Sequence, residues 1–341
     1  MQYVRMIDNS GPGRTHVRRE MKTIWAISDG AAGNRRQAWA LAHAMGGPVR
    51  ELVLAPRPPW SWFAPRVLPG GRLALDLAAR GALSPPWPDL AVGCGRQAAL
   101  ATRLIARLAE RRTRTVQILD PRIAPRHWDA VVAPRHDGLA GANVLAPLGS
   151  LHPIDDDWLQ DARSAWTVFS RMPSPRIGVL LGGSRPGVSL DARWLAALVG
   201  TLRRLLADGG SAMIMASRRT PDGLPDACAD ALAGYPQLLW RGVHDGANPY
   251  PGVLAWADRL LASPDSVNML SEAAATGAPV HTVALSTLPL RLARFHAALA
   301  EGGWLVEPGA PLGAAAPLRE TPAIAAELRA RLNWSPERGT A

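Results

Sequence analysis

The sequence predicts an α/β protein in which two Rossmann-like, doubly wound domains face each other across a cleft. Short apolar runs alternate with helical patterns along almost the whole chain, which is typical of parallel βαβ units. This alternation begins near residue 23 and begins again near residue 176. The length of 341 residues is sufficient for two domains of ordinary size, each with its own hydrophobic core.

The composition excludes several other classes of protein. Hydrophobic residues make up 48% of the chain and charged residues 19%, which describes a globular protein rather than a disordered one. No window approaches the roughly 18 uncharged apolar residues that a membrane-spanning helix needs. The two cysteines, Cys94 and Cys228, lack CxxC spacing, so we expect neither a disulfide framework nor a cysteine zinc site. We therefore expect a cytoplasmic protein, with peripheral attachment to the inner membrane as an open alternative.

The formal charge of +10 comes almost wholly from arginine, because Lys22 is the only lysine. Arginine favours planar, bidentate contacts with phosphate and carboxylate groups. One interpretation is a GC-rich genome that encodes arginine in place of lysine. The other is an anionic partner: a nucleotide diphosphate, a nucleic acid or an acidic membrane. Charge alone does not choose between them.

The first half of the chain is expected to form an N-terminal Rossmann-like domain over residues 23–154. A flexible tail is expected over residues 1–22, or a true start at Met21, because the first twenty residues lack the apolar stretch of a secretory signal. The first strand leads into a loop and a helix that ends at two glycines. Strands are expected at residues 23–28, 49–55, 89–95, 115–119, 129–133 and 143–148, with a second helix at 96–112.

The second half repeats the same alternation. Residues 155–175 are expected as an interdomain linker, 176–320 as a C-terminal Rossmann-like domain, and 321–341 as a C-terminal helix and tail. Strands are expected at residues 176–183, 211–217, 237–242, 258–263 and 280–285. Helices are expected at 189–210, 225–234, 249–257, 265–277 and 289–303.

One Pro-rich insertion, "APRPPWSWFAPRVLPGGR" at residues 55–72, interrupts the first half. Its prolines forbid a long helix. It could be a surface loop that tucks its aromatic side chains onto the domain. It could equally be an interfacial patch, with tryptophan at headgroup depth and arginine drawn to anionic lipid. Its aromatic and basic residues are Arg57, Trp60, Trp62, Phe63, Arg66 and Arg72.

Polar and glycine-rich loops follow three strands of the second half. Ligands of doubly wound sheets bind beyond the carboxyl ends of the strands. The loop "LGGSRPG" at 181–187 lets backbone approach a ligand, and its Arg185 is available for a phosphate. The loop "SRRTPDG" at 217–223 offers two hydroxyls and two arginines at the same edge. With "SPDSVNM" at 263–269, their recurrence favours an anion site over isolated tight turns.

The helix that follows "SPDSVNM" carries a single carboxylate, Glu272, among small residues. Asp265 and Ser266 are candidates for its cap, and its free N–H groups and positive dipole end suit a diphosphate. Helical spacing places Asn268 and Glu272 on one face. A carboxylate one turn past an anion-binding helix start is well placed to accept both hydroxyls of a ribose. No GxGxxG, P-loop, GxSxG or HExxH motif occurs.

The stretch "SEAAATGAPV" (Ser271 to Val280) resembles the donor-site helix of GT-B glycosyltransferases, such as the lipid-linked N-acetylglucosamine transferase of peptidoglycan synthesis. A fuller resemblance is to a narrower family, the bacterial relatives of the plant "elongated mitochondria" fission protein. The segments that carry it run in the expected order from about residue 23 to 300: "SDGAAGNRRQA", "GCGRQAA", "DPR", "DAVVAPRHD", "LGSLHPI", "LLGGS", "SRRTP", "GANPY" and "DSVNMLSEAAATGAPV". The resemblance implies a GT-B-like fold.

The resemblance also implies roles for individual residues. Donor contacts would come from Gly183, Ser184, Ser217, Arg218, Ser266, Asn268 and Glu272, and Glu272 would hold the ribose. The acceptor side would comprise Gly33, Asn34, Arg96 and Gln97.

The base of the implied transfer reaction is harder to assign. Several GT-B transferases place a histidine base in the first glycine loop, where this chain has Asn34, and an amide cannot take a proton. An inverting transfer still needs a base near the acceptor hydroxyl. Asp29 is the first candidate, followed by His136 and Asp137. No metal is expected, because no DxD-type motif is evident and the helix dipole and arginines would stabilise the departing diphosphate.

The leading hypothesis is a glycosyltransferase that uses a nucleotide-diphosphate sugar as donor substrate, without a separate cofactor, and an envelope or lipid-linked acceptor. The alternative is a non-catalytic adaptor that recruits a protein partner to a membrane, as the role of the plant relative in fission suggests. A third hypothesis is a nucleotide-sugar epimerase, which would need histidine and acidic residues converging in the cleft. An anionic membrane surface at residues 55–72 is the other partner considered, no nucleic acid is expected, and the oligomeric state stays open.

Overall fold

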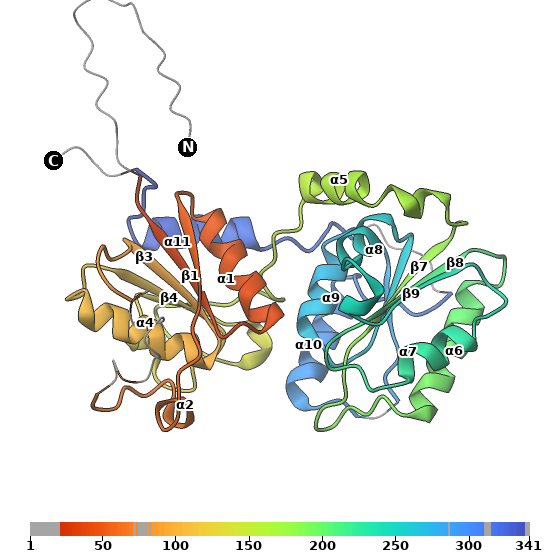
Figure 1. Cartoon of the computed structure of the whole chain (residues 1–341), viewed down its shortest axis with the longest axis horizontal. Coiled ribbons are helices and arrows are strands. Elements are labelled where there is room, and N and C mark those ends of the chain that lie inside the picture. The colour runs from red at the N-terminus through yellow and green to blue at the C-terminus, as the bar shows by residue number, and fades with distance from the viewer. Residues whose placement is uncertain are drawn as a thin grey trace, which may run out of the picture.

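Two lobes, each built on one parallel β-sheet, make up the protein (Figure 1). The computed structural model describes residues 21–70, 73, 81, 83–285, 287–309 and 315–337. Most of the tail expected over residues 1–22 lies outside the described residues, as do Arg72 and residues 338–341. The mixed α/β architecture with two parallel sheets confirms the predicted fold class.

The N-terminal lobe contains a six-stranded sheet with the order β2-β1-β3-β4-β5-β6, in which every neighbouring pair is parallel. Its strands are β1 (Ile24–Ser28), β2 (Val49–Val53), β3 (Leu90–Cys94), β4 (Arg114–Ile118), β5 (Ala130–Val132) and β6 (Val144–Leu145). Its helical elements are α1 (Ala32–Ala44), α2 (Trp60–Phe63), α4 (Arg96–Leu108), η2 (Pro125–His127) and η3 (Arg135–Asp137). The strand order reverses between β1 and β3, so the loops after these strands form the switch point of this sheet.

The C-terminal lobe contains a five-stranded parallel sheet with the order β11-β10-β7-β8-β9. Its strands are β7 (Arg176–Leu181), β8 (Ser211–Ala216), β9 (Gln237–Trp240), β10 (Arg259–Ala262) and β11 (Val280–Thr282). Its helical elements are α6 (Ala192–Leu205), α7 (Leu224–Asp230), η5 (Val243–Asp245), α8 (Tyr250–Trp256), α9 (Val267–Ala274) and α10 (Leu290–Glu301). The switch point lies between β7 and β10, where ligands of such sheets bind.

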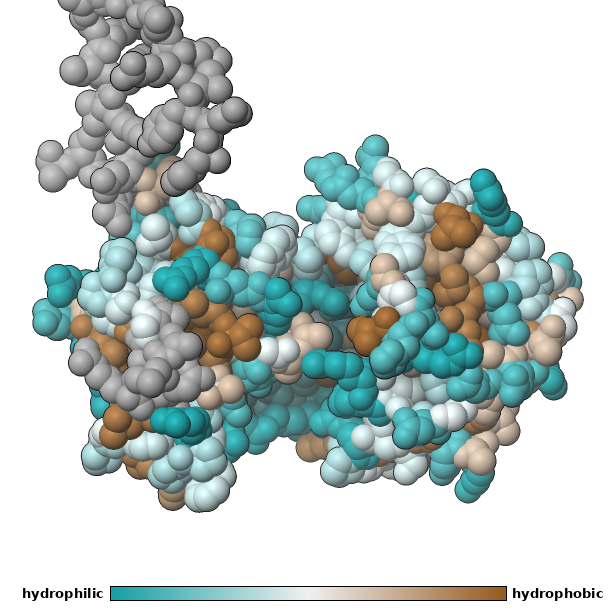
Figure 2. Space-filling model, in the orientation of Figure 1, coloured by the Kyte–Doolittle hydropathy of each residue, from teal (hydrophilic) through white to brown (hydrophobic). Residues whose placement is uncertain are grey.

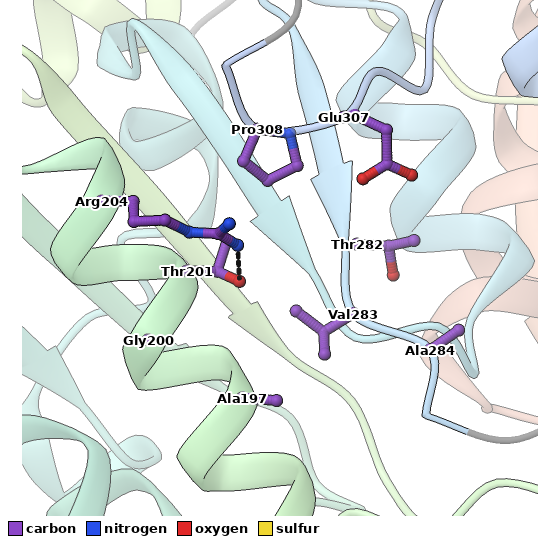
Figure 3. Close-up of a pocket in the computed structure, with 9 residues that line it drawn as sticks. All are labelled: Ala197, Gly200, Thr201, Arg204, Thr282, Val283, Ala284, Glu307 and Pro308. Atoms are coloured by element: carbon purple, nitrogen blue, oxygen red, sulfur yellow. Dashed lines mark hydrogen bonds between the residues drawn. The ribbon is translucent and has the colours of Figure 1, made fainter.

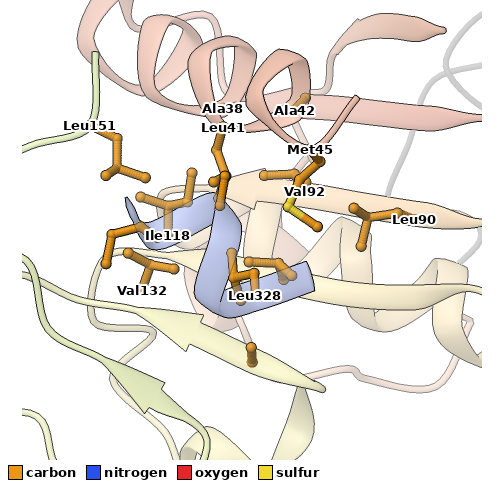
Figure 4. Close-up of a cluster of buried hydrophobic side chains, with 14 of the residues drawn as sticks. Ala38, Leu41, Ala42, Met45, Leu90, Val92, Ile118, Val132, Leu151 and Leu328 are labelled. Atoms are coloured by element: carbon orange, nitrogen blue, oxygen red, sulfur yellow. The ribbon is translucent and has the colours of Figure 1, made fainter. Parts of the chain in front are cut away.

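The last helix, α11 (Thr321–Arg331), returns to the N-terminal lobe and completes its core. Figure 4 shows Leu328 of α11 among side chains from α1 and the sheet, including Leu41 and Ile118. The indole N–H of Trp334 donates to the carbonyl of Met45, at the end of α1, over 3.1 Å. The N-terminal lobe therefore depends on a segment that follows the whole C-terminal lobe in sequence.

Two chain segments cross between the lobes, and they are bonded to each other. The backbone N–H groups of Leu148 and Gly149 donate to the two carboxylate oxygens of Glu320, each over 2.9 Å. His152 and Thr321 exchange two further hydrogen bonds, of 3.0 and 2.8 Å. The chain connects the two lobes through these two segments, which we call the paired crossing.

The segment 155–175, expected as a linker, packs on the C-terminal lobe. It contains α5 (Asp156–Ala165), whose cap Asp155 accepts from the N–H of Trp158, and the turn η4 (Thr167–Arg171). Phe169 of η4 is fully buried in the core of this lobe. At Gly252 of α8, an added Cβ would lie 2.6 Å from Phe169, so only glycine permits this close approach.

Candidate functional site

The region between the lobes is hollowed and lined mainly by hydrophilic residues on the face that Figure 2 shows. Helix α1 of the N-terminal lobe faces α9 and α10 of the C-terminal lobe across it (Figure 1). The carboxyl ends of β7 and β10, which flank the switch point of the second sheet, lead into this region through the loop 182–191 and the loop before α9.

Asp265 organises the loops at this switch point. Its carboxylate is completely buried and accepts from the hydroxyl of Ser263 over 2.6 Å and from the N–H of Gly183 over 3.1 Å. An added Cβ at Gly182 would lie 2.0 Å from Asp265, and one at Gly183 would lie 2.3 Å from the carbonyl of Arg219. The two glycines are therefore required for the loops after β7, β8 and β10 to meet.

Two guanidinium groups are held at the start of α9 by the same residue. Arg219 Nη2 donates to the carboxylate of Asp265 over 2.9 Å, and Arg185 Nη1 donates to its carbonyl over 3.1 Å. Ser266 caps α9, with its hydroxyl accepting from the N–H of Met269 over 3.3 Å. Positive charge, free N–H groups and the positive end of the helix dipole therefore coincide here.

The remaining polar residues predicted in these loops shape the backbone or face solvent. The hydroxyl of Ser184 accepts from the N–H of Leu190 over 3.1 Å. The hydroxyl of Ser217 accepts from the N–H of Arg219 over 3.2 Å. Arg218 is exposed, and its neighbour Arg219 is the arginine that reaches Asp265. Sequence reasoning identified the arginine pair but not which member is anchored.

A small pocket adjoins the arrangement of Arg185, Arg219 and the start of α9, which we call the cradle. It has a volume of about 200 Å³ and is bounded by the loop before α6, the loop after β10 and the segment after β11. Its walls combine apolar and polar side chains. The lining residues are Val188, Ser189, Asp191, Arg193, Trp194, Pro264, Ala284, Leu285 and Leu288. Its size and mixed polarity suit a flat heterocycle rather than a second charged group.

A larger cavity, of about 510 Å³, lies between α6 and the end of β11. Figure 3 shows Arg204 extending from α6 and Glu307 on the opposite wall. Arg204 Nη2 donates to the hydroxyl of Thr201 over 3.3 Å. The cavity lining carries one guanidinium and one carboxylate, whereas two guanidinium groups accompany the single carboxylate of Asp265 at the start of α9, so the cavity favours a diphosphate less.

The carboxylate of Glu272 faces the other lobe and is already bound by protein groups. Its side chain is 3% exposed, and Oε2 accepts from the hydroxyl of Tyr250 over 2.6 Å and from Nη1 of Arg36. The Arg36 guanidinium also lies 5.3 Å from the centroid of the Tyr250 ring. Burial, followed by the adjacent carboxylate, raises the pKa of Tyr250, so its hydroxyl stays protonated and donates.

Sequence reasoning missed Arg36 and Tyr250 as residues of this site. Both lie in segments that carried the family resemblance, "GNRRQA" and "GANPY". Burial lowers the pKa of Arg36, but Glu272 and Tyr250 raise it by more, so the guanidinium stays charged. The signal available in the sequence was a pair of arginines on a helix after the first strand, without an indication of which one turns toward the other lobe.

A second contact between the same helices lies beside this ion pair. Gln37 Nε2 donates to Asn268 Oδ1 over 3.3 Å. An added Cβ at Gly33 would lie 1.9 Å from Asn268 Nδ2. Gly33, predicted on the acceptor side, therefore lies directly against Asn268, predicted on the donor side.

Asp29, the first candidate for a base, lies at the switch point of the first sheet. Its Oδ1 accepts from the N–H of Ala31 and from Nδ2 of Asn34, each over 3.0 Å. An added Cβ at Gly95 would lie 2.5 Å from Asn34 Nδ2. Asp29 and Asn34 are thus brought together as one unit, and Arg96 and Gln97 begin α4 immediately after Gly95.

His136 and Asp137 lie in η3, which packs against α10 of the other lobe. The ring of His136 lies 5.2 Å from that of Phe295, and burial lowers the pKa of His136. Asp137 Oδ1 lies 3.1 Å from Arg291 Nη1 and 3.9 Å from His136 Nε2. A histidine and an acidic residue therefore meet at the lobe interface, and the acidic residue, Asp137, is paired with Arg291.

Two further findings concern metals and membranes. Within the part of the chain that the structure describes, no group of three or more His, Cys, Asp or Glu side chains could hold a metal ion. None of the helices formed by the described residues is long and apolar enough to cross a membrane.

Two Rossmann-like lobes with a hydrophilic hollow between them define a protein of GT-B-like fold. The chain belongs to the Mitochondrial fission ELM1 family, whose model matches residues 32–332. The mitochondrial fission protein ELM1 of Arabidopsis thaliana is 31% identical over 250 residues, which are 66% of this chain and 58% of the relative. The match thus spans little more than half of the length of that protein.

Solved structures resemble the chain in fold. The UDP-GlcNAc 2-epimerase of Methanocaldococcus jannaschii, solved with UDP-GlcNAc and UDP, has a TM-score of 0.51 and 11% identity, covering 92% of this chain and 100% of its own. MurG of Acinetobacter baumannii has a TM-score of 0.47 and 16% identity, covering 91% and 90%. At such identities the likeness to the epimerase establishes the fold and nothing about activity.

Proposed function

We propose that the C-terminal lobe binds a nucleotide-diphosphate sugar and that the protein transfers the sugar to an acceptor held by the N-terminal lobe. The observation that carries this proposal is the convergence of Arg185 and Arg219 on Asp265 at the start of α9, beside Gly183. Both guanidinium groups and the helix N-terminus can neutralise a diphosphate, in the ground state and as it departs.

The pocket beside the cradle supports a place for the base of the nucleotide. It opens between Ser189 and Pro264, in the loops that follow β7 and β10. A heterocycle there would contact the apolar side chains of Leu285 and Leu288.

A ribose held by Glu272 would have to compete with Arg36 of the other lobe and with Tyr250 of the same lobe. Because Tyr250 and Arg36 both donate to Oε2, the ribose hydroxyls gain full access to this carboxylate only when α1 moves away from α9. Donor binding is therefore coupled to separation of the lobes in this proposal.

Asp29 is the proposed base, with Asn34 as a positioning residue. The two amide–carboxylate contacts, 3.0 and 3.2 Å, orient the Asp29 carboxylate. As a base, Asp29 would take the proton of the acceptor hydroxyl while that oxygen forms a bond to the anomeric carbon and the nucleoside diphosphate leaves. The proposed mechanism uses no metal, since the leaving group would be stabilised by arginine and the helix dipole.

Calorimetric titration with UDP, GDP and ADP, and with sugars carried on each, tests the proposal. We expect one class to bind, and Arg185→Ala and Arg219→Gln to weaken its binding by tenfold or more. Arg171→Ala is the matched control, because this exposed arginine of η4 precedes β7 and so lies at the opposite edge of the sheet. An unaltered protein that binds none of these nucleotides would rule the proposal out.

A non-catalytic adaptor is the second candidate, and the occupied carboxylate of Glu272 is the observation that favours it. A carboxylate bound on one oxygen by Tyr250 and Arg36 can serve to hold the lobes together, without any ligand. An adaptor would bind no nucleotide, and Asp29→Asn would leave its partner binding unchanged. A transferase would bind nucleotide equally well as Asp29→Asn but lose turnover.

A further inference from the structure

The N-terminal lobe carries a second surface that the cleft chemistry does not use. We define it as the α2–α4 face, and it comprises Trp62, Phe63, Arg66, Arg103, Arg107, Arg111 and Arg126. Trp62 is 69% exposed and Phe63 is 49% exposed, although large aromatic side chains are normally well buried. These residues come from α2 and the turn after it, from α4 and its end, and from η2.

The segment that carries Trp62 and Phe63 is firmly attached to the lobe. One side of α2 packs on the lobe, because Trp60 and Ala64 contact Leu100 and Leu104 of α4. Arg103 Nη1 donates to the carbonyl of Pro65 over 2.6 Å. Trp62 and Phe63 lie between these contacts, which therefore fix the segment with both aromatic side chains exposed to solvent.

Four arginines gather around His127 of this face, and one of them, Arg103, also contacts the α2 segment. Burial lowers the pKa of His127 in η2, and the charges of Arg103, Arg126, Arg107 and Arg111 lower it further. Within the described residues, no ion pair joins a carboxylate to any of those four arginines. Among the described residues, the face therefore presents four arginines that pair with no carboxylate, together with exposed aromatic surface.

We propose that the α2–α4 face docks on an anionic lipid bilayer. Trp62 and Phe63 enter the boundary between headgroups and acyl chains, and the arginines contact lipid phosphates. Adjacent aromatics on one helical turn can enter a fluid interface together, and the arginine stems cover apolar surface while their heads remain hydrated. A single-stranded nucleic acid would instead require successive stacking platforms along a basic groove.

The face extends along the side of the lobe. The chain enters α2 after leaving β2 at the carboxyl edge of the sheet, the edge that also carries Asp29 and Gly95. Arg111 and Arg126 precede β4 and β5, so this end of the face lies toward the amino edge of the sheet. The docking inference itself does not depend on nucleotide binding.

Flotation of the full-length chain with vesicles tests the inference. We expect binding to vesicles of phosphatidylcholine with phosphatidylglycerol, and at least tenfold weaker binding to phosphatidylcholine alone. The double variants Trp62→Ala/Phe63→Ala and Arg107→Gln/Arg126→Gln should each reduce binding by tenfold or more. Trp39→Ala is the matched control, because this aromatic residue of α1 is also exposed, at 39%, and should leave binding unchanged.

Three results would overturn the inference. The unaltered chain could fail to float with anionic vesicles. The double variants could float as well as the unaltered chain while showing the same thermal unfolding temperature. A single-stranded oligonucleotide could bind with an affinity that the same double variants abolish, while the vesicles do not compete, which would assign the face to nucleic acid.

Discussion

Glu272 shows what one residue can and cannot reveal from sequence. A carboxylate among small side chains, one turn past a helix start, predicts a polar contact. The structure provides such a contact, but from Arg36 and Tyr250, which lie 236 and 22 residues away in the chain. The small size of the residues beside Glu272 has a separate explanation. The hydroxyl of Ser271 accepts from the N–H of Ser150, in a segment that crosses between the lobes. Whether a ribose also uses Glu272 is the question that ligand titration addresses.

His152 predicts a dependence of stability on pH. Its Nε2 donates to the carbonyl of Leu318 and its Nδ1 accepts from the N–H of Ile154, so the native ring is neutral. Burial lowers the pKa of His152 below its unfolded value of about 6.5. As pH falls below about 6.5 the unfolded chain binds the proton first, and the free energy of unfolding decreases by up to about 1.4 kcal/mol per pH unit.

Denaturant unfolding between pH 7.5 and 5 measures this effect. The variant His152→Gln should show a shallower decrease than the unaltered protein, because it cannot take up the proton. Other buried histidines with lowered pKa values, His281 and His296, will keep part of the slope. His43→Asn, at an exposed position of α1, serves as control and should retain the full slope. Equal slopes in all three proteins would refute the role of His152.

At the scale of elements, hydrophobic patterning predicted most of the structure. The apolar strands β1 and β3 are buried at every position, because helices cover both faces of a parallel sheet. The weakest prediction was the linker at 155–175. Its polar composition obscured α5, although the start of that helix carries Asp155 as cap and acidic residues in its first turn. Only Leu159 and Ala162 of α5 are buried, so the apolar periodicity was too sparse to detect.

Helix α11 gives a prediction about the stability of the N-terminal lobe. Leu328 is fully buried among residues of that lobe, so Leu328→Ala should remove about 2–5 kcal/mol from its free energy of unfolding. Hydrogen exchange resolved by peptide would locate the loss. Protection should decrease in β1 and β3 and stay unchanged in β7 and β8. The surface variant Glu327→Ala should alter protection little, and a loss confined to the C-terminal lobe would contradict the packing described.

At the scale of the molecule, sequence alone could predict two lobes and a cleft but not their contacts. Gly33 was predicted as part of an acceptor loop, and Asn268 as part of a donor helix. Their direct apposition depends on how the lobes are oriented, which local periodicity does not encode. The same limit applies to Arg291, which lies 3.1 Å from Asp137 across the interface. Contacts of this kind require the paired crossing at Gly149 and Glu320 to place the lobes first.

The ion pair between Arg36 and Glu272 predicts a change in lobe separation. Arg36→Ala would leave the carboxylate of Glu272 buried beside α1 without its charged partner, an arrangement that costs several kcal/mol. Opening the lobes hydrates that carboxylate and leaves each hydrophobic core intact, so opening is the least costly response. We expect a larger radius of gyration in solution X-ray scattering, with little change in secondary structure.

Two further variants make the test of lobe separation specific. The double variant Arg36→Ala/Glu272→Gln removes the unpaired charge and should return the radius of gyration toward the original value. Arg35→Ala is the matched control one residue away, because Arg35 pairs with Glu51 inside the N-terminal lobe and has no part in the interface. If Arg35→Ala and Arg36→Ala scatter alike, the pair does not hold the lobes together. If only Arg36→Ala opens them, lobe separation and access to Glu272 are one equilibrium, and a ligand that binds this carboxylate will shift it toward the open form.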